Sequence, residues 1–355
     1  MKKFKQLLRQ WRIAFGKRLL DQTKPTGALD QTSLKRVLFL RQDGKIGDYI
    51  VSSFVFRELK KYNPNLEIGV VCSDDSLFIK NPHIDHIYRV KKKNIIDYLK
   101  TGLKLRKVRY DVLIDPTIFL RNRDLMLIRL INARVNIGYL KAEYGIFNVN
   151  IADPQLHFSA VYYNALRLLG IENIDDRYDI PQDPISTQNI ADFIVRNQLA
   201  PIIALNCFGA ASARRFSTEN IIRLLDYLAP LCANKTIVLL TYPQVTAQLT
   251  KIADKYDNVV VYADTRTIFD SIALIQQAET VISPDTSIIH IASGFSKNVI
   301  AFYQDKQQDP VNFTHWYPNN HGQTHILFYQ HNLNEIPPEA IQADWLNIQE
   351  GSVSA

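Results

Sequence analysis

The chain has 355 residues, of which 46% are hydrophobic and 22% are charged, a composition typical of a globular protein with two domains of ordinary size. No apolar run is long enough to span a bilayer, and basic residues interrupt every apolar stretch near the N-terminus, so neither a transmembrane nor a secreted protein is expected. The net charge of +7 indicates an anionic partner, which leaves nucleic acid, a membrane surface and a phosphorylated substrate open.

Residues 1–20 combine apolar and basic side chains at helical spacing. Basic residues fall largely between apolar residues that recur at steps of three and four, namely Phe4, Leu7, Leu8, Trp11, Phe15 and Leu19. This pattern predicts a basic amphipathic helix of the kind that lies in a membrane interface. A helix that packs on its own domain or on a partner fits the same pattern, so both interpretations stay open.

Short apolar runs alternate with helical patterns along the rest of the chain. After a polar linker at 22–33, the sequence predicts helices beginning near residues 47, 94 and 120 and strands at 35–41, 66–72, 85–90, 110–116 and 134–139. The second series has helices from about residues 218, 245, 267 and 286 and strands at 201–207, 235–240, 258–262, 279–284 and 298–303. Strands buried on both faces and separated by helices indicate two doubly wound parallel sheets of the Rossmann-like α/β class. The Pro- and Asp-rich segment 175–188 is the predicted hinge between two domains.

Ligands of such sheets bind beyond the carboxyl ends of the strands, so the strand-to-helix junctions are the candidate sites. At the first junction, Gly44 and Gly47 allow a tight turn, and Asp48 falls in the first helical turn, where the helix dipole favours its ionised form. The spacing matches neither a P-loop nor a dinucleotide-binding GxGxxG motif. Asp48 either stabilises the helix start or acts as a general base at a cleft, and this junction alone leaves both open.

Two junctions of the second series carry polar residues suited to phosphate. Asp285, Thr286 and Ser287 follow a predicted strand at a predicted helix start, where exposed amides and hydroxyls make a natural diphosphate site. Asp285 either caps this helix or accepts hydrogen bonds from a sugar. Arg214 and Arg215 follow another strand and are able to neutralise phosphate oxygens, although paired arginines are more often a solvated face.

These junctions, taken in order, resemble the ADP-heptose:lipopolysaccharide heptosyltransferases of glycosyltransferase family 9. The resemblance covers about residues 36–303 and is carried by RQDGKIGDYIVSSF (41–54), NPHIDHIY (81–88), YDVLIDP (110–116), ARVNIGY (133–139), ARRFSTENI (213–221) and SPDTSIIHIASGF (283–295). The sequence departs from the family pattern at three positions. Phe54 stands at the usual proline, Arg214 at the usual lysine and Ser287 at the usual glycine.

The resemblance implies a GT-B fold, in which two Rossmann-like doubly wound domains face each other across a cleft. The N-terminal domain, 34–180, would bind the acceptor, and the C-terminal domain, 181–317, would bind the nucleotide sugar. Residues 1–33 form the leader and linker. The tail, 318–355, is expected to pack back on the N-terminal domain.

The resemblance also assigns roles to single residues. Asp48 is the implied catalytic base, which takes the proton from an acceptor hydroxyl as that hydroxyl attacks the anomeric carbon of the donor. Arg214 and the amides at Thr286 and Ser287 would stabilise the departing ADP, and Asp285 would orient the donor sugar hydroxyls. The other expected contacts are Gln244 at the ribose, where many relatives carry an acidic residue, the backbone near Tyr262 and Ala263 at the adenine, and an acceptor loop of Gly44, Lys45 and Gly47.

The chain has no Asp-x-Asp motif to hold a divalent ion between phosphates, so a metal-independent, inverting transfer without a cofactor is expected. The expected donor is ADP-heptose, and the expected acceptor is the Kdo/heptose inner core on lipid A in the inner leaflet of the cytoplasmic membrane. Residues 1–20 would then hold a cytoplasmic, peripheral enzyme at that anionic surface.

Two other functions are compatible with parts of the sequence. A family-9 transferase that uses another nucleotide sugar or another glycan acceptor fits the same motifs. A non-catalytic module that binds sugar nucleotides or nucleic acid is suggested by the basic charge alone. The chain has neither the aromatic-basic interleaving of RNA-binding proteins nor a helix-turn-helix pattern, so no nucleic-acid partner is expected. Retention of Asp48 and of the Asp285-Thr286 helix start argues against a non-catalytic scaffold.

Overall fold

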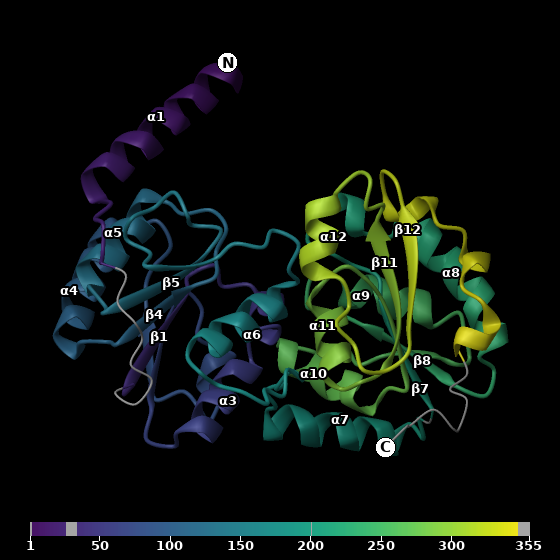
Figure 1. Cartoon of the computed structure of the whole chain (residues 1–355). Coiled ribbons are helices and arrows are strands. Elements are labelled where there is room, and N and C mark those ends of the chain that lie inside the picture. Colours follow the sequence, from purple (N-terminus) through teal and green to yellow (C-terminus); the bar gives the residue numbers. More distant parts are fainter. Residues whose placement is uncertain (1, 26–33, 200, 347–355) are drawn as a thin grey trace. The chain divides into compact units, whose positions relative to one another are not determined.

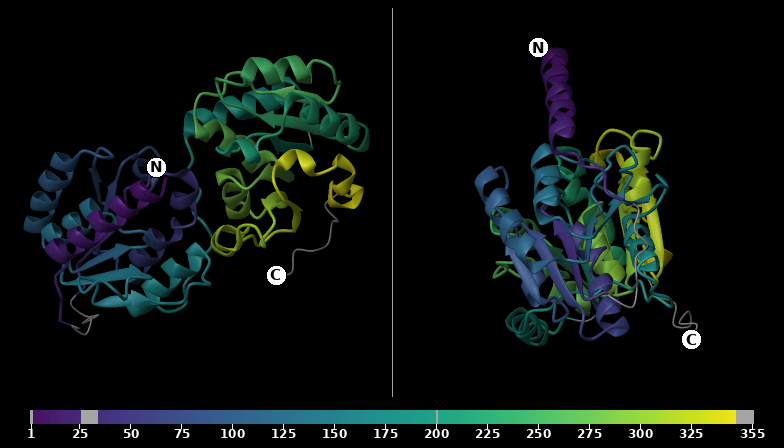
Figure 2. Two further views of the ribbon diagram at one scale, coloured as in Figure 1. Left: turned by 90° about the horizontal axis from the view of Figure 1, so that it is seen from above. Right: turned by 60° about the vertical axis from the view of Figure 1, so that its left-hand side comes forward.

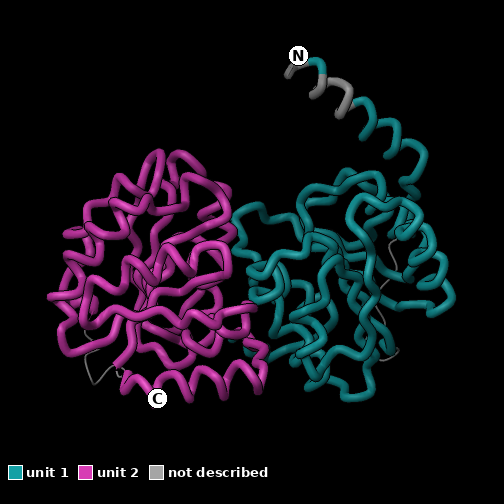
Figure 3. The backbone as a smooth tube through the Cα atoms, turned by 180° about the vertical axis from the view of Figure 1, so that it is seen from behind, with its two compact units in different colours: residues 1–177 teal, residues 178–355 magenta. Residues whose placement is uncertain are grey.

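A computed structural model describes residues 2–25, 34–199 and 201–346 and divides the chain into two compact units (Figures 1 and 3). Unit 1 comprises residues 1–177 and unit 2 residues 178–355, so the division falls within the predicted hinge at 175–188. Each unit is an α/β domain built on one parallel sheet. Within the described ranges, no helix combines the length and the hydropathy needed to cross a membrane.

Unit 1 contains six parallel strands in the order β3-β2-β1-β4-β5-β6. The strands are β1 (Arg36–Arg41), β2 (Glu67–Cys72), β3 (His86–Arg89), β4 (Val112–Asp115), β5 (Val135–Tyr139) and β6 (Val149–Ile151). The helices are α1 (Lys2–Leu20), α2 (Ile46–Ile50), α3 (Phe54–Tyr62), α4 (Ile95–Val108), α5 (Asn122–Ile131) and α6 (Phe158–Leu168). The strand order reverses direction between β1 and β4, which makes the carboxyl ends of these two strands the switch point where α/β domains bind ligands.

Unit 2 repeats this topology with the strand order β12-β11-β10-β7-β8-β9. Its strands are β7 (Ile202–Asn206), β8 (Thr236–Leu240), β9 (Val259–Val261), β10 (Thr280–Pro284), β11 (Asn298–Gln304) and β12 (Thr324–Tyr329). Its helices are α7 (Pro184–Arg196), α8 (Thr218–Leu231), α9 (Thr246–Ala253), α10 (Ile268–Gln277), α11 (Ser287–Gly294) and α12 (Pro310–Trp316). The switch point of this sheet lies between β7 and β10.

The cores explain why the strands could be predicted. In β1 the side chains from Val37 to Leu40 are all buried, and β7 is buried along its whole length, as expected for strands covered by helices on both faces. All predicted strands are present. Two further strands, β6 and β12, have mostly half-exposed side chains and were not predicted. β6 lacks a continuous apolar run, whereas β12 contains one at 326–329.

The helices begin close to their predicted starts, because capping residues mark them. Asn94 caps α4, Thr267 caps α10 and Thr286 caps α11, each through a side-chain oxygen that accepts a backbone N–H of the first turn. The sequence reading missed α6, α7 and α12. Helix α7 begins at Pro184, inside the predicted hinge, with Asp183 as its cap.

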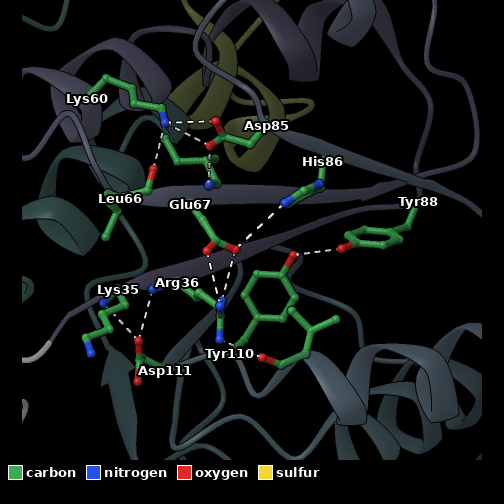
Figure 4. Close-up of polar contacts among 12 residues, drawn as sticks. Lys35, Arg36, Lys60, Leu66, Glu67, Asp85, His86, Tyr88, Tyr110 and Asp111 are labelled. Carbon is green, nitrogen blue, oxygen red and sulfur yellow. Dashed lines mark hydrogen bonds and ion pairs between the residues drawn. The ribbon is translucent and has the colours of Figure 1, made fainter.

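A polar network joins the amino ends of the strands in unit 1 (Figure 4). Arg36 of β1 forms an ion pair with Glu67 of β2, with 2.9 Å between Nε and Oε2, and Asp111 accepts hydrogen bonds from the backbone N–H groups of Lys35 and Arg36. The Asp85 carboxylate accepts the backbone N–H of Ile68 at 2.7 Å. The network lies at the edge opposite the switch point, so it fixes strand register and leaves the carboxyl edge to ligands.

The tail packs on unit 2, which corrects the expectation that it packs back on the N-terminal domain. Leu333, Ile341 and Leu346 belong to the hydrophobic core of unit 2. Lys235 Nζ donates to the carbonyl of Leu346 at 2.8 Å, and Trp345 stacks on His325 of β12. The tail thus contacts unit 2 as far as Leu346, and residues 347–355 lie outside the described residues.

The leader forms the predicted helix, α1, and one of its faces packs on unit 1. Asn122 of α5 donates to the carbonyl of Arg12 at 2.8 Å, and Lys17 lies 3.4 Å from the Glu143 carboxylate. The N-terminal part of α1 projects beyond the rest of unit 1 (Figure 2). One face of the leader is therefore a packing face of its own domain, whereas Phe4, Trp11, Phe15 and Leu19 are 57–70% exposed.

The position of the tail predicts where a tail substitution destabilises the protein. Ile341→Ala removes a side chain that is 1% exposed within the core of unit 2, so the free energy of unfolding of unit 2 should fall by about 2–5 kcal/mol. Urea unfolding followed by tryptophan fluorescence measures this, because Trp316 and Trp345 both belong to unit 2. Val311→Ala is the control, since Val311 is 60% exposed and should change little. A loss confined to unit 1 would contradict the packing described.

Candidate functional site

In unit 1, the loop after β1 turns sharply into the short helix α2. Gly44 has a φ of +59°, a left-handed conformation that L side chains rarely adopt, and a Cβ at this position would lie 2.5 Å from Ser73 Oγ. Lys45 is exposed and Gly47 is half-buried. Asp48 lies in the first turn of α2, as predicted, and is 8% exposed. The chain then bends and resumes as α3, whose first residue is Phe54.

The carboxylate of Asp48 lies near one acidic residue, Asp43, and two basic residues, Arg41 and Lys45. Its Oδ1 lies 3.9 Å from Arg41 Nη2 and its Oδ2 lies 3.9 Å from Lys45 Nζ. Burial, and next the nearby Asp43 carboxylate, raise the pKa of Asp48 to about 6, against the lowering effects of Arg41 and Lys45. A carboxylate with this pKa accepts a proton more readily than an ordinary surface aspartate, as a general base must.

Arg41 is the buried partner that sequence reasoning did not single out. It is the last residue of β1 and is 2% exposed, and its Nη2 lies 3.4 Å from Asp43 Oδ2. Its Nη1 donates to the hydroxyl of Tyr162 from α6. A buried guanidinium needs compensating charge, and Asp43 and Asp48 provide it. The only sequence signal was its place at the start of the motif that ends in Asp48.

Two further buried charged groups, Asp115 and Lys141, follow β4 and β5. Asp115 ends β4, and its Oδ1 accepts hydrogen bonds from the backbone N–H and the hydroxyl of Thr117 at 3.0 and 2.7 Å. Burial raises the pKa of Asp115. Lys141 is 1% exposed, and its Nζ donates to the carbonyls of Ile118 at 2.9 Å and Tyr139 at 3.0 Å, while burial lowers its pKa. These groups hold the loop after β4 in place beside the Asp48 junction.

In unit 2, the junctions after β7 and β10 meet through one ion pair. Arg214 Nη1 lies 2.8 Å from Asp285 Oδ2 and also donates to the Asp285 carbonyl at 3.2 Å. Asn312 of α12 donates to the same Oδ2 at 2.9 Å. Asp285 is 6% exposed and Arg214 is 28% exposed at its side chain, so the pair has a buried anion and an accessible cation. The structure brings both predicted residues together and adds Asn312.

The start of α11 is organised by hydroxyl groups. Thr286 is the N-cap, and its Oγ1 accepts the backbone N–H of Ile288 at 3.3 Å. Asn206, at the end of β7, donates to Ser283 Oγ at 2.9 Å and to Thr286 Oγ1 at 3.3 Å. Thr286 therefore caps α11. The backbone N–H of Ser287, the first residue of α11, lies at the open N-terminal end of the helix. Sequence reading missed Asn206, because its partners come from another strand.

The other residues predicted for the nucleotide lie on the neighbouring junctions. Gln244 is exposed between β8 and α9. The ring of Tyr262 packs against Phe193 of α7, with ring centroids 5.1 Å apart, and its carbonyl accepts the Thr265 hydroxyl at 2.9 Å. Ala263 is exposed and its carbonyl accepts a bond from Arg266 at 3.4 Å. Gln244, Tyr262 and Ala263 thus follow β8 and β9, at the same carboxyl edge as Arg214 and Asp285.

Two residues near this edge are structural. Arg215 Nε donates to the carbonyl of Gly209 at 2.7 Å and closes the loop after β7, so the structure separates its role from that of Arg214. His290 is buried inside α11 against Trp316, and burial lowers its pKa to about 4, which keeps the imidazole neutral. In the part of the chain that the structure describes, no three His, Cys, Asp or Glu side chains come together as a metal site would need.

Comparison with known proteins finds similarity to one family. The sequence model for glycosyltransferase family 9 (heptosyltransferase) matches residues 226–336. The chain is 23% identical over 324 residues to a putative lipopolysaccharide heptosyltransferase 4 of Escherichia coli (strain K12), covering 88% of this chain and 87% of that protein.

Solved structures show the same fold. The family-9 glycosyl transferase from Veillonella parvula DSM 2008 superposes with a TM-score of 0.66 at 18% identity, over 83% of this chain and 86% of that one. The ADP-heptose lipopolysaccharide heptosyltransferase II of E. coli superposes with a TM-score of 0.63 at 15% identity, over 88% of this chain and 97% of that one. The two parallel-sheet domains therefore correspond to the GT-B fold.

The surroundings of Asp48 predict opposite shifts of its pKa in two variants. Asp43→Asn removes a like charge, so the Asp48 pKa should fall below about 6 but stay above the ordinary aspartate value of 3.8, because burial remains. Lys45→Gln removes an opposite charge and should raise the same pKa. A ¹³C-carboxyl NMR titration of the aspartates measures both. Shifts of the same sign in the two variants would contradict the described balance of charges.

Proposed function

We propose that the chain is a member of glycosyltransferase family 9 and that it transfers heptose from ADP-heptose to the Kdo/heptose inner core of lipopolysaccharide. The observation that carries the proposal is Asp48, a buried carboxylate of raised pKa at the switch point of unit 1. A base of this kind is what an acceptor hydroxyl needs in order to attack a sugar. The names of the similar proteins support the choice of sugar and acceptor.

In the proposed reaction, the acceptor hydroxyl oxygen attacks the anomeric carbon of the donor while Asp48 takes its proton. A new glycosidic bond forms as the bond between the anomeric carbon and the diphosphate oxygen breaks, and the electron pair leaves with ADP. Direct displacement inverts the configuration at the anomeric carbon. The half-exposed Gly47, the tight turn at Gly44 and the exposed Lys45 lie beside Asp48 and form the approach for the acceptor.

Charge on the departing diphosphate would be stabilised in unit 2. Arg214 offers an accessible guanidinium, and the start of α11 offers the backbone N–H of Ser287 and the positive end of the helix dipole. Asp285, held by Arg214 and Asn312, is oriented to accept bonds from donor sugar hydroxyls. We assign the adenine to the backbone near Tyr262 and Ala263 and the ribose to Gln244. With Arg214 and the helix start supplying positive charge, the proposed transfer needs neither a metal ion nor a cofactor.

The acceptor would reach the enzyme at the inner leaflet of the cytoplasmic membrane, where a peripheral, cytoplasmic protein would meet it. Helix α1 supports this placement, because its aromatic face is exposed while the opposite face packs on unit 1. A different nucleotide sugar or a different glycan acceptor is the second candidate. It is favoured by Ser287, which adds a side chain at the helix start, and by the junction after β8, which carries Gln244 instead of a carboxylate.

The first test is transfer from ADP-heptose to truncated inner-core acceptors, followed by mass spectrometry with EDTA present. Asp48→Asn should lower kcat by about 10²–10⁴-fold, because an amide cannot take the proton, while binding of ADP is retained. Asp43→Asn is the matched control and should keep most of the activity at neutral pH. Wild-type turnover by Asp48→Asn would remove Asp48 as the base. Wild-type activity with another nucleotide sugar alone would establish the second candidate.

Arg214 and Arg215 allow a paired test of the leaving-group side. Arg214→Ala should lower kcat by about 10²–10³-fold, since it removes a cation aimed at the developing diphosphate charge. Arg215→Ala should leave kcat within a few-fold of wild type, because that side chain closes a loop through Gly209. Steady-state kinetics with saturating donor measures both. Equal losses in the two variants would indicate that Arg214 acts only through the fold.

A further inference from the structure

Helix α4 of unit 1 exposes an apolar stripe that no part of the fold covers among the residues described. Ile95, Ile96, Leu99 and Leu103 are 48%, 56%, 39% and 52% exposed. Residues 95, 99 and 103 follow one another at steps of four, so they form a single ridge, with Ile96 beside it. Aliphatic residues scattered singly on a surface are ordinary, but three on one ridge with a fourth beside it form a patch.

The face of α4 that adjoins the ridge is firmly packed, so the ridge cannot turn inward. Tyr98, Gly102 and Leu105 are buried. Gly102 lies directly against α5, where an added Cβ would come within 2.7 Å of Leu130. The aliphatic ridge is therefore held facing outward by the packing of the rest of the helix.

Basic residues border this ridge on the side away from α5. Lys100, Lys104 and Lys107 are exposed at positions adjoining the ridge, and Lys104 Nζ lies 5.3 Å from the ring centre of Tyr88 on β3. Lys91, Lys92 and Lys93 precede the helix and are exposed as well. An acid, Asp97, is half-buried near the first turn. The ridge thus has the composition of an interfacial helix, aliphatic along one line and cationic beside it.

Helix α5 lies between this ridge and the leader. It contacts α4 through Leu130 and contacts α1 through Asn122, which bonds to the carbonyl of Arg12. On α1 the face away from α5 carries Trp11 and Phe15, which are 70% and 66% exposed. Two amphipathic helices with exposed apolar faces and basic borders are therefore fixed to one supporting helix.

From this arrangement we propose that the exposed ridge of α4 is a second membrane-docking element of unit 1, which inserts into the surface of an anionic bilayer beside α1. The lysines beside the ridge indicate which surface it binds. Lysine side chains would contact anionic lipid headgroups, while the aliphatic ridge would enter the acyl layer beneath them. The inference rests on the proposed function in so far as that function places the acceptor in a membrane. Docking through two helices would fix the orientation of unit 1 at the surface, which one helix alone does not.

A fluorophore at Leu103→Cys tests α4 separately from α1. The native Cys72, Cys207 and Cys232 are all buried, so the introduced thiol is the accessible one among the described residues. Adding phosphatidylglycerol vesicles to the full-length chain should shift the emission to the blue, whereas phosphatidylcholine vesicles should give little change. Binding of the chain without any shift would overturn the proposal by showing that α4 stays in water.

A double variant measures the contribution of the ridge to binding. Leu99→Glu with Leu103→Glu should lower the vesicle partition coefficient by about ten-fold or more, since two inserted aliphatic groups become anions. Ile185→Glu with Val195→Glu adds the same charge at exposed sites of α7 in unit 2 and should have little effect. Equal losses of vesicle binding in both double variants would overturn the proposal. It would also be overturned if the wild-type chain proved to be a dimer and the ridge variant did not. Transfer to a soluble acceptor should be unchanged in the ridge variant. This assay therefore distinguishes a failure of the proposed heptose transfer from a failure to bind vesicles.

Discussion

Burial of the strands on both faces is the constraint on which the rest of this structure depends. Each sheet is wholly parallel, and its central strands carry buried apolar side chains on both sides, so little polar chemistry can lie along those strands. Polar groups collect where the strands end. The amino edge of unit 1 carries the Arg36–Glu67 ion pair and Asp111, which fix register, while the carboxyl edge carries Asp48. The strand order then brings the junctions after β1 and β4 together, and likewise those after β7 and β10.

At the carboxyl edge of unit 1, the state of Asp48 is set by competing effects. Burial and Asp43 favour the protonated form, whereas Arg41 and Lys45 favour the ionised form, and burial is the largest of the four. Arg41 is held in place by β1 and by Tyr162, so its charge cannot move away from the two carboxylates. The outcome is a carboxylate that is ionised near neutral pH and still basic enough to take a proton.

The sequence predicted those features that are local. Apolar runs marked the strands from β1 to β11 except β6, and capping residues such as Asn94 and Thr267 marked helix starts, because both signals involve neighbours in the chain. The half-exposed β6 carries no such run, whereas β12 carries one at 326–329 that was not assigned to a strand. The tail was placed on the wrong domain, since only long-range packing of Leu333 and Ile341 decides where it docks. Asn206 and Asn312 act through partners on other elements, and single asparagines carry no pattern that reveals this.

The geometry of the ion pair between Arg214 and Asp285 explains how Arg214 could contact Asp285 and a diphosphate at the same time. Asp285 bonds through its carboxylate and its carbonyl to a single nitrogen of Arg214, Nη1. A guanidinium has five N–H donors in a planar fork, so contact with Asp285 does not consume its capacity to bind phosphate oxygens. An ammonium group concentrates its charge at one atom, and a lysine at this position would have to divide the same point charge between carboxylate and diphosphate. Arginine at position 214 therefore suits an arrangement in which the group proposed to orient the sugar and the group proposed to stabilise the diphosphate remain joined.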